Sequence, residues 1–102
     1  RFLIIEPHHD YPKIEERGEP FSLKEMQAAV GGDIEPINLI SVSYDARRRA
    51  NDLKDMLLSE GVYIFANEEG RRLKQEFNPL ASKLIGVELV GPVLICSSEL
   101  IE

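Results

Sequence analysis

The sequence predicts a single α+β domain with a mixed, mostly antiparallel sheet, two main helices and one short helix. Three observations support this prediction. The chain has 102 residues, which is the length of one small domain. Short apolar runs typical of strands lie between segments whose apolar residues recur every three or four positions, which is typical of helices. Residues that start helices, end helices or form turns separate these segments.

The N-terminal third is expected to hold one strand and one helix. Residues 2–6 form a short apolar run of β-branched and aromatic residues, which indicates a buried strand. Residues 22–30 carry the clearest helix signal. Ser22 and Glu25 have the spacing of a capping box, and Gly31 supplies the left-handed residue that ends a helix.

The middle of the chain is expected to form a strand, a helix and a second strand. Residues 34–44 are predicted as a strand that begins beyond Pro36, because proline cannot donate to the ladder. Residues 45–60 are predicted as a helix, and residues 62–66 as a buried strand. The apolar residues of this helix follow the i, i+4, i+7, i+11 spacing of one face: Ala46, Ala50, Leu53 and Leu57.

The C-terminal third is expected to begin with a turn at residues 67–70, because asparagine leads it and glycine ends it. Residues 71–77 are predicted to return as a strand that buries its apolar side chains. The Asn78-Pro79 step is predicted to start a short helix, with asparagine as its cap and proline in its first position. Residues 87–90 and 93–96 are predicted as strands.

Composition excludes several classes of protein. The formal net charge of −6 argues against a general nucleic-acid binder, which normally carries a basic excess. A single cysteine forms no intramolecular disulfide, so a cytoplasmic location is the expectation. We see no signal peptide and no apolar run near the roughly 20 residues that span a bilayer, so no membrane partner is expected.

Four stretches, in this order along the chain, are similar to those of a known family: L-I-I-E-P at Leu3–Pro7, V-G-G-D-I-E at Val30–Glu35, N-E-E-G at Asn67–Gly70, and N-P-L-A-S from Asn78 followed by V-G-P-V-L-I from Val90. The sequence resembles the small bacterial, phage and plasmid family known as domain of unknown function 3846. The resemblance implies a mobile-element context and brings no reaction, cofactor or catalytic residue. Relative to that family, residues from about 43 to 60 are expected to be a helical insertion.

Five arginines in two clusters are the candidate ligand-binding residues: Arg47, Arg48, Arg49, Arg71 and Arg72. The first three fall in the first turns of a predicted helix, where each exposed positive charge is unfavourable to the helix dipole by roughly 0.3–1 kcal/mol. A helix N-terminus also favours phosphate. The alternative is internal pairing of Arg48 with Asp52 and of Arg49 with Asp45.

Two further groups of residues have chemistry of interest. His8, His9 and Asp10 are metal-ligand types, but neighbouring side chains point apart in an extended chain, so an exposed polar loop is expected and a metal site is not. Cys96 lies in a predicted buried strand, where cysteine behaves as a small hydrophobe, so no catalytic residue is expected. Sequence motifs of P-loop, dinucleotide-binding and serine-hydrolase sites are absent, and no cofactor is expected.

These observations favour a non-enzymatic binding or regulatory module that acts through a protein partner. That hypothesis predicts an exposed apolar patch or a homo-oligomer. The alternative is a binder of a phosphorylated small molecule or of a nucleic-acid backbone, which requires both arginine clusters on one face. A third hypothesis, an enzyme that uses Cys96 with His8 or His9, requires an accessible thiol.

Overall fold

A four-stranded antiparallel sheet with strand order β1-β4-β3-β2 forms the centre of the molecule. The computed structural model describes residues 1–42 and 44–101. The strands are β1 (Phe2–Ile5), β2 (Ile34–Pro36), β3 (Val62–Asn67) and β4 (Val93–Ser97). The α+β class and the antiparallel pairing are as the sequence predicts.

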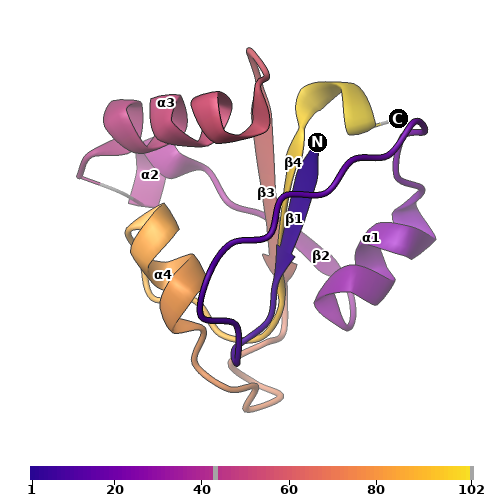
Figure 1. Ribbon diagram of the computed structural model, residues 1–102. Coiled ribbons are helices and arrows are strands. Elements are labelled where there is room, and N and C mark those ends of the chain that lie inside the picture. The colour runs from indigo at the N-terminus through magenta and orange to yellow at the C-terminus, as the bar shows by residue number, and fades with distance from the viewer. Residues whose placement is uncertain (43, 102) are drawn as a thin grey trace.

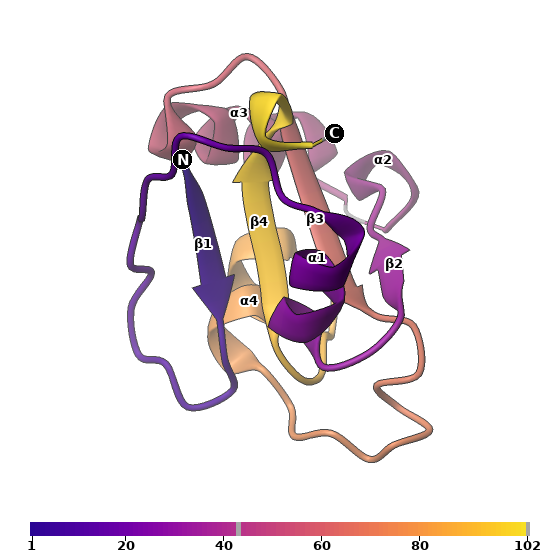
Figure 2. The ribbon, with the colours of Figure 1, turned by 90° about the vertical axis from the view of Figure 1, so that its right-hand side faces the viewer.

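Helices cover both faces of this sheet. They are α1 (Leu23–Val30), α2 (Leu39–Val42), α3 (Ala46–Leu57) and α4 (Pro79–Ile85), with a 3₁₀ turn η1 (Ser98–Leu100) near the C-terminus. Figure 1 shows α1 on one side of the sheet and α3 and α4 on the other, and Figure 2 shows α2 beside the β2 edge. The two main helices and the short helix α4 are confirmed, and α2 is an element that the sequence patterns did not predict.

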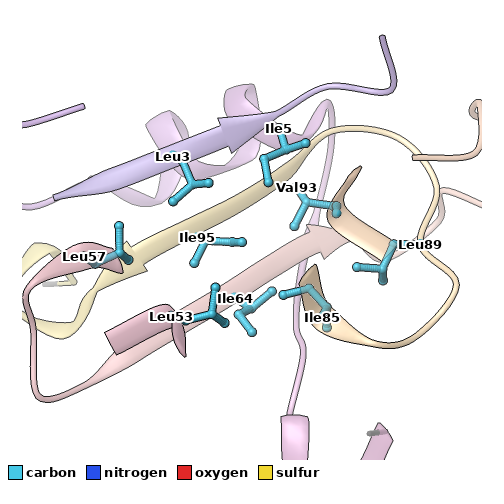
Figure 3. Packing of buried hydrophobic residues seen from close by; sticks show 10 residues of the cluster. Leu3, Ile5, Leu53, Leu57, Ile64, Ile85, Leu89, Val93 and Ile95 are labelled. Carbon is cyan, nitrogen blue, oxygen red and sulfur yellow. The ribbon is translucent and has the colours of Figure 1, made fainter. Parts of the chain in front are cut away.

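Successive strand residues point to opposite faces of the sheet and therefore feed two hydrophobic clusters. Leu3, Ile64, Val93 and their alternating neighbours pack against α3 and α4, as Figure 3 shows. On the other face, Phe65 and Leu94 pack with residues that include Met26 and Val30 of α1. The predicted apolar face of α3 lies in the first cluster, to which it contributes Leu53 and Leu57.

Helix α1 begins and ends where its sequence predicts. The Ser22 hydroxyl accepts a hydrogen bond from the Glu25 N–H (3.1 Å), and the Glu25 carboxylate accepts one from the Ser22 N–H (3.0 Å). That backbone hydrogen bond, together with the nearby Arg17, lowers the pKa of Glu25 below its usual value. Gly31 ends the helix with a φ of 81°, a conformation that costs glycine little.

Asn78 caps α4 and ties it to two other segments. Its side-chain oxygen accepts a hydrogen bond from the Ala81 N–H (3.1 Å), as a helix cap does. Its side-chain nitrogen donates to the carbonyls of Ile5 and Gly91, both at 2.8 Å. The side chain is completely buried, so these hydrogen bonds form out of reach of water. One amide therefore joins the end of β1, the start of α4 and the approach to β4.

The structure corrects the strand expected at residues 34–44, of which Ser43 lies outside the described residues. Pairing begins before Pro36 and stops just after it, so the prediction of a strand beyond Pro36 was wrong. Asn38 turns the chain into α2, because its side-chain oxygen accepts a hydrogen bond from the Ile40 N–H (3.0 Å).

The return strand expected at residues 71–77 is also wrong, because this segment forms consecutive turns. The Leu73 N–H donates to the carbonyl of Glu69 (2.8 Å), and Lys74 takes a positive φ of 54°, which no extended strand allows. Leu73 and Phe77 are each 53% exposed and are not core residues. Their four-residue spacing is therefore not a sign of burial here.

The strand expected at residues 87–90 is reduced to an isolated bridge between Phe77 and Val90. The backbone N–H and carbonyl of Leu89 form hydrogen bonds with residues of α4 and its cap instead of with a strand. The Leu89 N–H donates to the Ser82 hydroxyl (2.8 Å), and the Leu89 carbonyl accepts a hydrogen bond from the Asn78 N–H (2.8 Å). The segment thus packs along α4 and not along a neighbouring strand.

Replacement of Asn78 by alanine is expected to lower the free energy of unfolding by about 3–7 kcal/mol. Two buried carbonyls would lose their donor at about 1–3 kcal/mol each, and a lost helix cap costs about 1 kcal/mol. Urea denaturation measures this change. The control is Asn51→Ala on the exposed side of α3, which should stay within about 0.5 kcal/mol. Equal stability of the two variants would contradict the role assigned to Asn78.

Candidate functional site

The arginines at the start of α3 do not act alike. Arg47 and Arg48 are exposed, whereas Arg49 reaches across to the end of α4. Its Nη1 donates to the carbonyls of Lys83 (2.6 Å) and Leu84 (3.2 Å), which lie in the last turn of that helix. A cation at this point satisfies carbonyls that have no partner within the helix and complements the helix dipole.

Gly86 shows how closely Arg49 packs on the end of α4. Gly86 ends this helix with a φ of 86°, and any side chain at that position would collide with the Arg49 guanidinium. Arg49 Nε is buried without a hydrogen-bond partner among the described residues. The cost of burying this group offsets part of the stability that the two Nη1 hydrogen bonds contribute. Arg49 is therefore a residue that joins α3 to α4.

The second arginine cluster is paired with acidic residues. Arg71 lies 3.4 Å from the Glu88 carboxylate and also donates to the Glu88 carbonyl (3.2 Å), and Arg72 pairs with Glu69. The expected pairs Arg48–Asp52 and Arg49–Asp45 are not among the ion pairs of the described residues.

No hydrogen bond or ion pair among the described residues joins the two arginine clusters directly. Arg49 contacts the end of α4 at Lys83 and Leu84, whereas Arg71 contacts Glu88 a few residues beyond that helix. Three of the five candidate arginines therefore make contacts within the protein: Arg49, Arg71 and Arg72.

Cys96 is completely buried on β4, and burial raises the pKa of its thiol to about 11. It is paired with Phe2 at the start of β1, whereas His8 and His9 follow the opposite end of that strand. The structure thus separates the thiol from both imidazoles, and it buries the thiol in the cluster beneath α1.

The turn after β1 does bring side chains together. The His8 and His9 rings lie 4.6 Å apart, and the carboxylate of Glu6 lies beside both. Asp10 is not part of this group. The sequence pattern pointed to the histidines, but it missed Glu6, which lies before the turn.

An apolar groove of about 350 Å³ lies between β3, α3 and the segment that contains α2. Its lining includes Pro36, Leu39, Ile40, Ala50, Val62 and Tyr63. Ile40 is 85% exposed and Tyr63 is 47% exposed. Tyr63 is held in place by its stacking on Phe65, with ring centroids 6.1 Å apart.

One strand edge opens into this groove. Pairing between β2 and β3 ends with the hydrogen bond from the Ile37 N–H to the Ile64 carbonyl (2.8 Å). Val62 and Tyr63 have a strand partner on the β4 side, but none on the other side in the described part of the chain. The sequence pattern missed the groove because it assigned residues 37–40 to a strand.

A second hollow, of about 500 Å³, lies at the start of α3. Tyr44, Arg47 and Arg48 line it, together with Asp45 and Asp52. Because it contains two cations and two carboxylates, this surface carries no clear excess of either charge. Arg48 and Asp52 lie on the side of α3 away from Ala50, which lines the groove, so the two hollows are separate.

The four stretches that carry the family resemblance are joined by two asparagines. Asn78 links the first stretch, through Ile5, to the last, through Gly91. Asn67 links the second and third, because its side-chain nitrogen donates to the Val30 carbonyl (3.3 Å) and its oxygen accepts from the Glu69 N–H (2.8 Å). These hydrogen bonds give the four stretches a role in maintaining the fold.

Replacement of Arg49 by alanine is expected to lower the free energy of unfolding by about 1–2 kcal/mol, because two carbonyls of α4 lose a charged donor. Chemical denaturation measures the change. The matched control is Arg48→Ala, one residue earlier and exposed, which should change stability by less than about 0.5 kcal/mol. A larger loss for Arg48→Ala would contradict the assignment.

The burial of Cys96 is expected to make stability depend on pH in alkaline solution. The folded thiol keeps its proton to a higher pH than the unfolded one, so its contribution is complete below pH 9 and is lost as pH rises toward 11. The free energy of unfolding should fall over this window by an amount of the order of 2 kcal/mol more than in Cys96→Ala. Parallel pH profiles of the two proteins would refute this prediction.

Comparison with known proteins places the chain in one family. In the part of the chain that the structure describes, no helix has the length and apolarity that a membrane crossing requires. No curated protein and no solved structure is significantly similar to the chain. One family match spans residues 1–100, which is nearly the full sequence. The chain belongs to this family, which is described as Domain of unknown function (DUF3846).

Proposed function

We propose that this protein is a non-enzymatic binding module that acts through a protein partner, and that the groove between α2 and β3 receives an extended segment of that partner. The observation that carries the proposal is the open edge of β3 at Val62, whose main-chain groups lie on the same side as those of Ile64, beside an apolar groove. An extended segment can pair with such an edge through its main chain and place a side chain in the adjacent pocket.

The exposed side chains around the groove support a partner that is a protein. Ile40 is 85% exposed, and a partner that covers it removes apolar surface from water at a gain of about 25 cal/mol per Å². Tyrosine is enriched in protein interfaces, and Tyr63 lines the groove. The groove offers apolar surface to a partner, and Asn38 and Tyr63 offer polar groups in its lining.

The chemistry of the groove favours binding over catalysis. Among the described residues, those that line it carry no carboxylate, imidazole, thiol or cationic group. Asn38 and Tyr63 provide the polar side chains of the lining, and neither has a partner there that would activate it as an acid, base or nucleophile. An apolar groove beside an open strand edge fits recognition of an extended chain.

A phosphorylated ligand is the less favoured alternative. Arg47 and Arg48 are the exposed members of the candidate set that remain near the start of α3, and Asp45 and Asp52 line the same hollow. The carboxylates would repel a phosphate at short range. Peptide selection and ATP binding separate the two functions.

A phage-displayed library of linear peptides, selected on the immobilised protein, is expected to yield binders that occupy the groove. Ile40→Asp should weaken their affinity by at least about tenfold, because it places a charge where an apolar contact is lost. The matched control is Leu23→Asp, which changes another exposed aliphatic side chain (55% exposed) on helix α1, across the sheet from α3. The affinity of the Leu23→Asp variant for the selected peptides should stay within about twofold of the wild-type value.

The binding mode is checked by amide chemical-shift changes in the peptide complex, which should centre on residues 62–64 and 37–40. Peptides that bind Ile40→Asp as tightly as the wild type would refute the groove as the binding site. Saturable binding of ATP that Arg48→Glu abolishes, with no peptide selected, would instead favour the phosphate-binding function.

A further inference from the structure

We propose that the turn after β1 binds a divalent transition-metal ion, with Zn²⁺ as the best-suited species, through Glu6, His8 and His9. This site lies at the end of the sheet opposite the groove, because β1 and β3 run in the same direction and the groove lies where β3 begins. The inference is therefore independent of the proposed function.

The turn itself brings the three side chains together. The His9 N–H donates to the Glu6 carbonyl (3.0 Å), which closes a four-residue turn with Pro7 in its second position. Proline favours this position because its fixed φ suits the turn. The chain is thus not extended at the two histidines, and their side chains do not point apart as adjacent strand residues would.

The distances between donor atoms are close to those of a metal site. The Oε2 atom of Glu6 lies 3.8 Å from Nε2 of His8 and 3.8 Å from Nε2 of His9. All three ligand atoms lie within 4.8 Å of one another. Bonds of about 2.0–2.2 Å in a tetrahedral site place donor atoms about 3.3–3.5 Å apart. Each histidine must therefore approach the Glu6 carboxylate by about 0.5 Å or less, and the two imidazoles must approach each other by at most about 1.5 Å.

The donor types and their exposure indicate which ion fits. Two imidazoles and one carboxylate suit Zn²⁺ and other borderline cations better than Mg²⁺ or Ca²⁺, which prefer oxygen ligands alone. The His8 side chain is 72% exposed and that of Glu6 is 47% exposed. An ion therefore reaches the site from solvent, and water can complete its coordination.

One hydrogen bond opposes metal binding and limits the affinity. Nδ1 of His9 accepts a hydrogen bond from the Glu6 N–H (3.1 Å), so a neutral ring carries its proton on Nε2. To ligate through Nε2, the ring must move its proton to Nδ1, and this hydrogen bond must break. The metal ion is therefore expected to exchange readily with solvent. It binds first to His8 and Glu6, and His9 joins them after its ring has released the Glu6 N–H.

Titration of the full chain without an affinity tag tests the proposal, with ZnCl₂ as the probe and calorimetry as the readout. One equivalent of Zn²⁺ is expected to bind, and MgCl₂ should not displace it. His8→Ala and His9→Ala should each weaken binding by at least about tenfold. Asp10→Asn, a neighbouring carboxylate outside the group, is the matched control and should stay within about twofold.

Thermal unfolding without metal shows whether the variants keep the fold. His8→Ala removes an exposed side chain and should leave the midpoint unchanged, whereas His9→Ala also removes the hydrogen bond from the Glu6 N–H and should lower it slightly. Absence of zinc binding to the wild type, or binding that the double variant H8A/H9A retains, would overturn the proposal. An equal loss in Asp10→Asn would overturn the assigned ligand set.

Discussion

The buried amide of Asn78 is the interaction on which most of this structure depends. It holds the end of β1, the start of α4 and the approach to β4 in one place. The position of α3 depends on α4, because Arg49 of α3 donates hydrogen bonds to the last carbonyls of α4. Helix α3 in turn forms one wall of the groove through Ala50. A single polar side chain in the core thus positions the turn after β1 directly and the groove indirectly.

Features of the fold that rest on neighbouring residues could be predicted from the sequence. The capping box at Ser22, the cap at Asn78 and the glycine that ends α1 depend on residues within a few positions, and all three are confirmed. The segment 71–77 was different. Its Leu73 and Phe77 suggested a buried face, but the segment closes turns through hydrogen bonds within residues 69–75, and both side chains are exposed. The apolar spacing is compatible with either structure, so it did not distinguish a strand from turns.

The candidate sites show a division between local and distant information. Arg49 was visible as a charged residue near a helix start, but its carbonyl partners lie more than thirty positions later, and no pattern around Arg49 reveals them. The histidines of the turn were visible as metal-ligand types, whereas their proximity to Glu6 depends on a reversal of the chain at Pro7. The groove could not be predicted because Asn38, which starts α2, lies within an apolar run that also suits a strand.

Pro36 has a consequence for the behaviour of the chain at high concentration. The neighbouring hydrogen bonds from Glu68 to Asp33 and from Ile37 to Ile64 place the Pro36 nitrogen on the outer side of β2, where another molecule would have to pair. A proline there offers no donor, and the strand is only three residues long. The exposed edge of the sheet is thereby a poor template for stacking copies of the chain into a fibril, although the short opening beside β3 stays accessible.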